Sequence, residues 1–216
     1  MTTIHDIDMK CYLCGETSSQ PILGSTSCWG HPDLDLRPAA MQRSSMIAWI
    51  LECPHCGYVS ERLDSETPIS MEFIKSNEYQ NCENYDFKRP LAARFYKNYM
   101  ICKETQNKSS EFTNLLHCAW ACDDVEDILA FEIRLKAIEV VEQLIEANHE
   151  NKINLMIIKA DLMRRANLFS DLIKEYENIS FDDELLNDII KFQIEKAESS
   201  DNRCYTVENV INEQEK

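Results

Sequence analysis

Two cysteine pairs decide how the N-terminal part of this chain folds: Cys11-Tyr-Leu-Cys14-Gly15 and Cys53-Pro-His-Cys56-Gly57. The two residues inside each pair let both thiolates reach one tetrahedral ion. The glycine after each pair permits the tight, partly left-handed turn that directs backbone N–H groups at sulfur. Two such pairs, separated by residues 15–52, predict a zinc ribbon with one structural Zn²⁺. Its predicted ligands are Cys11, Cys14, Cys53 and Cys56.

A site of four thiolates leaves no coordination position open for water or substrate, so we expect this ion to be structural and not catalytic. Cys28 and His31 also have zinc-ligand spacing, but no glycine turn follows either residue. Cys118 and Cys122 lie four residues apart with His117 beside them, which raises the alternative of a second metal or redox site. We favour the simpler interpretation, because free cysteine usually behaves as a small buried hydrophobe.

The composition is that of a folded protein, with 44% hydrophobic and 28% charged residues among 216. The first residues show no basic region followed by an apolar stretch, and no apolar run reaches about 18 residues, so we expect neither a signal peptide nor a membrane span. The expected location is cytoplasmic. Ten cysteines in a reducing compartment indicate metal binding and free thiols in place of disulfides.

The acidic charge is concentrated after the ribbon. Residues 1–62 hold four basic and seven acidic side chains, so most of the net charge of −16 comes from residues 63–216. Nucleic-acid binding draws most of its affinity from Lys and Arg that neutralise phosphates. Nucleic acid is therefore not an expected partner, and a basic patch near Arg37, Arg43 and Arg62 is the feature that would favour it.

Residues 1–62 are predicted to form the ribbon. We expect residues 1–10 to be a lead-in and 15–44 a loop with at most short strands. Residues 46–52 are apolar and rich in β-branched and aromatic side chains, so they are predicted to be the strand that precedes Cys53. Residues 58–60 would be the returning strand.

Residues 63–216 are predicted to be a helical domain, which makes the fold class α+β and mostly α. Thr67-Pro68 begins a short helix, and residues 76–90 form a connection with a turn or two of helix. Ser109 or Ser110 is the expected N-cap of the second long helix. After Asp201 we expect a frayed tail. The apolar periodicity predicts longer helices over about 90–104, 110–122, 126–148, 153–167, 170–179 and 183–198.

The stretch from Ala160 to Ile179 resembles a tetratricopeptide repeat. In that repeat Ala160 would lie where two helices cross closely, Phe169 would open the second helix, and Tyr176 would pack against the first. Leu172 departs from the pattern, which usually has alanine there. Taken whole, the ribbon and the paired helices resemble an uncharacterised bacterial family that joins an N-terminal zinc ribbon to a tetratricopeptide-like tail. The resemblance implies an antiparallel tetratricopeptide-like array of bacterial, cytoplasmic origin, and no reaction.

One loop combines several reactive side chains. His31, Asp33, Asp35 and Arg37 fall within the stretch 29–37. In an extended segment the two aspartates would face the same side and, with the histidine, could bind a metal or act as acid and base. The competing interpretation, which we favour, is a structured loop in which a carboxylate pairs with Arg37 and caps backbone N–H groups.

We therefore expect a zinc-stabilised cytoplasmic protein-interaction scaffold without catalytic residues. Its partner would be a protein that the sequence does not name. One alternative is a nucleic-acid-associated zinc-ribbon factor, and the other is a metal-dependent enzyme that uses the 28–37 loop. No Gly-rich phosphate loop, nucleophile elbow or His-Glu-x-x-His pair occurs in the sequence.

Overall fold

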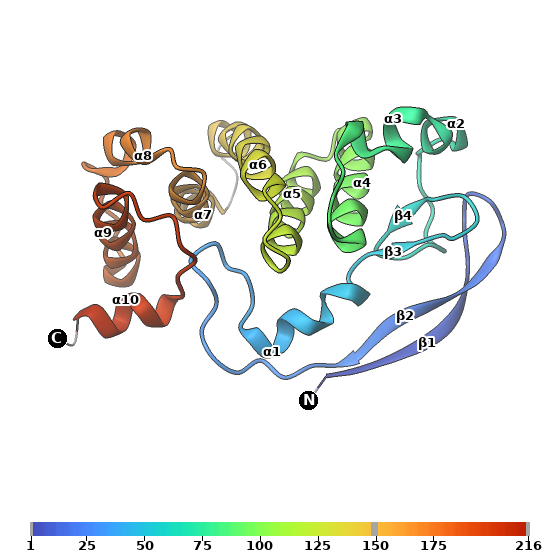
Figure 1. The fold of residues 1–216 in the computed structure, drawn as a ribbon, viewed down its shortest axis with the longest axis horizontal. Helices are drawn as coiled ribbons and strands as arrows, with labels where there is room; N and C mark the ends of the chain where they lie inside the picture. The colour runs from blue at the N-terminus through green and yellow to red at the C-terminus, as the bar shows by residue number, and fades with distance from the viewer. Residues whose placement is uncertain (1, 148–150, 215–216) are drawn as a thin grey trace. The chain divides into compact units, whose positions relative to one another are not determined.

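The computed structural model describes residues 2–147 and 151–214 and confirms a mostly helical chain with small antiparallel sheets in its N-terminal part (Figure 1). The strands are β1 (Thr3–Lys10), β2 (Thr17–Ser25), β3 (Leu51–Glu52) and β4 (Val59–Ser60). The helices are α1 (Ala40–Arg43), α2 (Met71–Lys75), α3 (Asn77–Gln80), α4 (Pro90–Glu104), α5 (Lys108–Asp123), α6 (Leu129–Glu146), α7 (Lys152–Arg165), α8 (Phe169–Tyr176), α9 (Glu184–Glu198) and α10 (Val207–Gln214).

The contacts divide the chain into two compact units. The first holds the described residues up to Trp29 together with Ala40–Ala130. The second holds Gly30–Ala39 and the described residues from Phe131 onward. These units do not coincide with residues 1–62 and 63–216. The division into a ribbon over residues 1–62 and a helical domain over 63–216 stays a prediction.

The longest strands lie where we expected a lead-in and a loop. β1 and β2 form an antiparallel ladder from Ile4↔Leu23 to Lys10↔Thr17, drawn in blue in Figure 1. Both expectations were therefore wrong. In β1 only Met9 is fully buried, and the exposed residues around it carry polar side chains. Most of the ladder consequently lacks the apolar alternation that identifies a half-buried strand.

The strand expected over residues 46–52 is largely wrong as well. Ser44–Ala48 forms a 3₁₀ helix, and only Leu51–Glu52 pairs with β4. The Ser45 hydroxyl donates to the Gln42 carbonyl over 2.7 Å and accepts the Trp49 indole N–H at 3.0 Å. Local hydrogen bonds of this kind compete with sheet ladders, and here they turn an apolar stretch into a tight helix.

α4 and α5 form the helical core of the first unit. Pro90 begins α4, as the sequence predicts. The N-cap of α5 is Asn107, whose side chain accepts the Ser110 N–H at 3.1 Å, so the expected serine caps were wrong. Between the two helices the buried amides of Asn98 and Asn114 hydrogen-bond at 2.9 Å, which fixes how the helices pair.

In the second unit a fully buried arginine joins α7, α9 and the following segment. Arg164 donates to Asp161 at 2.7 Å and to the Gln193 side chain. It also donates to the carbonyls of Asp201 and Arg203, each at 2.8 Å. The segment after Asp201 is therefore held by α7 and continues into α10. The expectation of a frayed tail was wrong.

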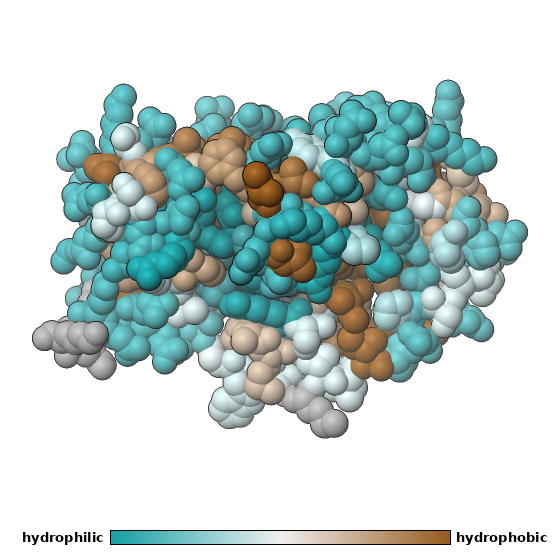
Figure 2. Space-filling view, in the orientation of Figure 1, coloured by the Kyte–Doolittle hydropathy of each residue, from teal (hydrophilic) through white to brown (hydrophobic). Residues whose placement is uncertain are grey.

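Hydrophilic side chains cover most of the face seen in Figure 2, and hydrophobic residues appear on it in separate small groups. Among the helices of the described residues, none has the length and the apolar content needed to cross a bilayer.

Candidate metal centre

The two predicted cysteine pairs form turns with matching backbone geometry. The Gly15 N–H donates to the Cys11 carbonyl, and the Gly57 N–H donates to the Cys53 carbonyl, both at 2.9 Å. The two glycines have φ angles of 77° and 78°, in the left-handed region that glycine adopts most readily. Each turn thus places two sulfur atoms on the same side of a short hairpin.

The four sulfur atoms meet in one cluster. The Sγ atoms of Cys11, Cys14, Cys53 and Cys56 all lie within 4.8 Å of one another. The distance is 3.8 Å between Cys11 and Cys56, and 3.6 Å between Cys14 and Cys53. Four sulfurs at about 2.3 Å from a tetrahedral zinc ion lie about 3.8 Å apart. The cluster therefore fits zinc, whereas a disulfide would need about 2.05 Å.

The pKa values of these thiols shift in different directions. Burial is the largest influence that raises the pKa of Cys11 and of Cys56. Burial also acts to raise the pKa of Cys14, but hydrogen bonds from the Glu16 backbone and the other cysteines outweigh it and lower this pKa. A bound metal ion removes the thiol protons and turns the sulfurs into its ligands. Cys11 and Cys53 are buried, and Cys14 and Cys56 are half-buried, as in a closed structural site.

Helices α3 and α4 hold the second cysteine turn. The Tyr79 hydroxyl donates to the Gly57 carbonyl at 3.0 Å. The Glu52 carboxylate, one residue before Cys53, accepts from Lys97 at 2.8 Å and from Arg94 at 3.3 Å. A metal ion at this cluster would therefore order the turn together with its contacts to α3 and α4.

The other candidate zinc ligands lie outside the cluster. Cys28 is exposed and donates to the Gln42 side chain at 3.2 Å. His31 and His55 are exposed. Among the described residues, the four cysteines are the one group of three or more His, Cys, Asp or Glu side chains that could share an ion.

The 28–37 loop does not present a reactive surface. Of its four candidate reactive side chains, His31 is exposed, and Asp33, Asp35 and Arg37 are at most 4% exposed. One oxygen of Asp35 accepts the Arg37 backbone N–H at 3.2 Å, and the other lies 3.3 Å from the Arg165 guanidinium. The loop caps its own backbone and pairs its charge with α7, which supports the structural interpretation.

The pair in α5 is also built into the core. Cys118 and Cys122 are both 0% exposed. The Cys118 thiol donates to the Ala92 carbonyl at 3.3 Å, and burial raises the pKa of this thiol. A neutral, inaccessible thiol is a poor nucleophile, and among the described residues this pair belongs to no group of three or more side chains that could share an ion. These residues act as buried core.

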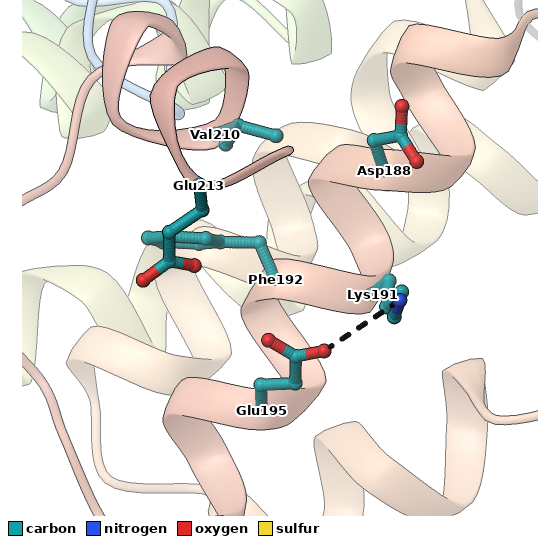
Figure 3. A pocket seen from close by; sticks show the side chains of 6 residues that line it. All are labelled: Asp188, Lys191, Phe192, Glu195, Val210 and Glu213. Atoms are coloured by element: carbon teal, nitrogen blue, oxygen red, sulfur yellow. Dashed lines mark ion pairs between the residues drawn. The ribbon is translucent and has the colours of Figure 1, made fainter. Parts of the chain in front are cut away.

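A separate cavity of about 350 Å³ lies between α9 and α10 (Figure 3). The carboxylates of Asp188, Glu195 and Glu213 point in different directions around Phe192. Lys191 lies 3.9 Å from Glu195, and Lys196 pairs with Glu213 at 2.7 Å. Its acidic groups therefore do not converge on a cation site.

Comparisons of the chain with protein-family models, with curated proteins and with solved structures gave no match.

Proposed function

We propose that this chain is a cytoplasmic, non-catalytic protein-interaction scaffold whose first unit is stabilised by one structural zinc ion. The observation that carries the proposal is the closed cluster of four cysteine sulfurs, attached through Glu52 and Gly57 to helices α3 and α4. A metal at such a cluster has no open position for substrate, so its effect is on folding. A rigid helical surface held by a metal suits recognition of another protein.

The tetratricopeptide-like arrangement of the later helices belongs to this proposal. Its support is local and lies in the second unit. Phe169 begins α8, and the buried Tyr176 hydroxyl donates to the Met156 carbonyl of α7 at 2.8 Å. Ala160 and Leu172 are both 0% exposed. A small residue on α7 and a large one on α8 fit close crossing of the two helices.

In the test, the full-length, zinc-loaded chain is immobilised on a resin and incubated with an extract of its host. Proteins that it retains are purified, and their affinities for the free chain are measured by calorimetry. We expect at least one purified protein to bind the wild-type chain with a Kd of about 1 μM or lower, and to bind the Cys53→Ser/Cys56→Ser variant much more weakly. Failure of every purified candidate to bind would contradict the proposal.

The structure gives little support to the two alternative functions. Of the basic residues that would favour nucleic acid, Arg37 is 4% exposed, and Arg62 pairs with Asp64 at 2.7 Å. For the metal-dependent enzyme, both carboxylates of the 28–37 loop are buried, and Asp35 pairs with Arg165. Retention of a nucleic acid by the immobilised chain, stable at physiological salt, would replace our proposal with the first alternative.

A further inference from the structure

A groove runs between the ribbon and the α4–α5 pair, inside the first unit. It consists of two adjoining cavities of about 430 and 340 Å³. Both cavities are lined by Glu61, Arg62 and Asn114. Segments 48–50 and 60–65 form one wall, and α4 and α5 form the other. We call this the ribbon–helix groove.

One end of the groove is aromatic. The His117 imidazole lies 5.2 Å from the Trp49 ring, 5.1 Å from Phe95 and 4.9 Å from Trp120, measured between ring centroids. Trp49 and His117 are half-buried, and both line the larger cavity. The Trp49 indole N–H donates a hydrogen bond to the Ser45 hydroxyl at 3.0 Å, which fixes the orientation of this ring.

The His117 imidazole contacts aromatic rings but has no hydrogen-bond partner among the described residues. Burial lowers its pKa to about 4, so at pH 7 the ring is neutral and one nitrogen accepts a hydrogen bond. A half-buried acceptor on a cavity wall suits a ligand that brings N–H donors.

Among the residues that line the two cavities, Glu61 is the one carboxylate. Glu61 is exposed, lines both cavities and has no ion pair among the described residues. Glu111 lines neither cavity and is 2% exposed; its Oε2 atom lies 3.0 Å from Lys108, and its Oε1 atom has no hydrogen-bond partner among the described residues. The pKa of the Cys102 thiol, which lines the smaller cavity, is raised to about 12. Burial is the largest cause, and the Glu111 and Glu61 carboxylates add to it.

The cation that lines the groove is already neutralised. The Arg62 guanidinium forms a two-point pair with the Asp64 carboxylate, at 2.9 and 2.7 Å. Glu61 therefore remains available as the charged group of the groove. A carboxylate without an ion pair beside half-buried aromatic rings on a cavity wall is a general arrangement for binding an organic cation.

We propose that the ribbon–helix groove binds an arginine side chain of a partner polypeptide, an inference that rests on the scaffold function proposed above. A guanidinium is planar and stacks on aromatic rings such as Trp49 and His117. Its several N–H donors suit the Glu61 carboxylate and the neutral imidazole together. The net charge of −16 also attracts basic segments of partners.

The test titrates the isotope-labelled, zinc-loaded full chain with the peptide acetyl-Gly-Gly-Arg-Gly-Gly-amide, followed by NMR at the Trp49 indole and the His117 ring. The matched peptide carries citrulline, which keeps the shape of arginine but has no charge. We expect saturable shifts at both rings and an affinity about tenfold higher for the arginine peptide. Equal affinities, or no shifts at either ring, would overturn the proposal.

Two variants and a small molecule complete the test. Glu61→Gln should lower the affinity for the arginine peptide about tenfold, and Glu66→Gln, on an exposed residue outside the groove, should not change it. Unaltered binding to Glu61→Gln would refute the site. Arginine amide that binds as tightly as the peptide would refute a polypeptide ligand. A purified partner that binds wild-type chain and Glu61→Gln equally would refute the groove and leave the scaffold function standing.

Discussion

Gly15 and Gly57 occupy equivalent turns after Cys14 and Cys56, but their surroundings differ. A methyl group on Gly57 would lie 2.8 Å from the Gln80 Nε2 atom, whereas on Gly15 the nearest atom is 4.0 Å away. Gln80 cannot move aside freely, because this nitrogen donates to the Ile74 carbonyl at 2.6 Å. A side chain is therefore tolerated less well at Gly57 than at Gly15.

This difference gives a matched pair of variants. Both glycines have left-handed φ angles, so alanine at either position should cost roughly 1 to 2 kcal/mol of backbone strain. Gly57→Ala should cost more than Gly15→Ala, because it also displaces Gln80. Urea unfolding of the zinc-loaded proteins measures both values. Equal losses of stability would contradict the packing described for Gly57.

His117 predicts acid sensitivity of the first unit. Its pKa is about 4 in the folded chain, lowered by burial, against about 6.5 in an unfolded chain. Between these values the unfolded state binds more protons, so stability falls as the pH decreases through this window. By pH 5 the loss should be about 2 kcal/mol.

The His117→Gln variant isolates this contribution, since both proteins keep the four cysteines. Urea unfolding of wild type and variant at pH 7 and pH 5 gives two differences in the free energy of unfolding. We expect a larger decrease for wild type. The same decrease in both proteins would show that His117 is not buried as a neutral ring.

At the level of elements, the ribbon and α4 are joined by a charged contact. The Glu52 carboxylate accepts from Lys97, whose side chain is 11% exposed, and from Arg94. Glu52→Gln should cost about 1 kcal/mol and should increase hydrogen exchange in β3 and β4. Glu66→Gln is the control, since Glu66 is exposed. Unchanged exchange in the ribbon would mean that this contact does not hold it.

The segment 30–39 is the element whose role was least clear from sequence, and one substitution separates the two interpretations. Asp35→Asn leaves Arg165 beside a neutral amide in a site where the carboxylate is 0% exposed. We expect a loss of about 3 kcal/mol in urea unfolding, because breaking a buried pair leaves a poorly compensated charge. His31→Ala, on an exposed side chain, should change stability little. An Asp35→Asn variant as stable as wild type would return this loop to the candidate functional sites.

Elements with a strong local pattern were predictable, and those shaped by packing were not. The helix over Pro90–Glu104 follows from its proline and its apolar stripe. The helix predicted over 183–198 likewise corresponds to α9, which spans Glu184–Glu198. The 3₁₀ helix at Ser44–Ala48 was missed, because its apolar residues suit a strand equally well.

At the scale of the whole molecule, the sequence predicted the metal cluster and the mostly helical class, because the cysteine spacing and the helical periodicity are local signals. It did not predict that segment 30–39 packs with α7 and the residues after Asp201, since this depends on contacts such as Asp35 with Arg165. The ribbon–helix groove was missed for the same reason. Trp49, Glu61 and His117 come from three separate elements and carry no shared motif.

One zinc ion should close the four-cysteine cluster, and native mass spectrometry of the full chain, together with elemental analysis, measures how much zinc is bound. We predict one zinc per chain in wild type and none in Cys53→Ser/Cys56→Ser. The Cys28→Ser/Cys204→Ser variant, which removes two exposed thiols, should keep one zinc. Wild-type protein without bound metal after preparation with zinc, or a Cys53→Ser/Cys56→Ser variant that retains one zinc, would show that these cysteines do not hold a zinc ion.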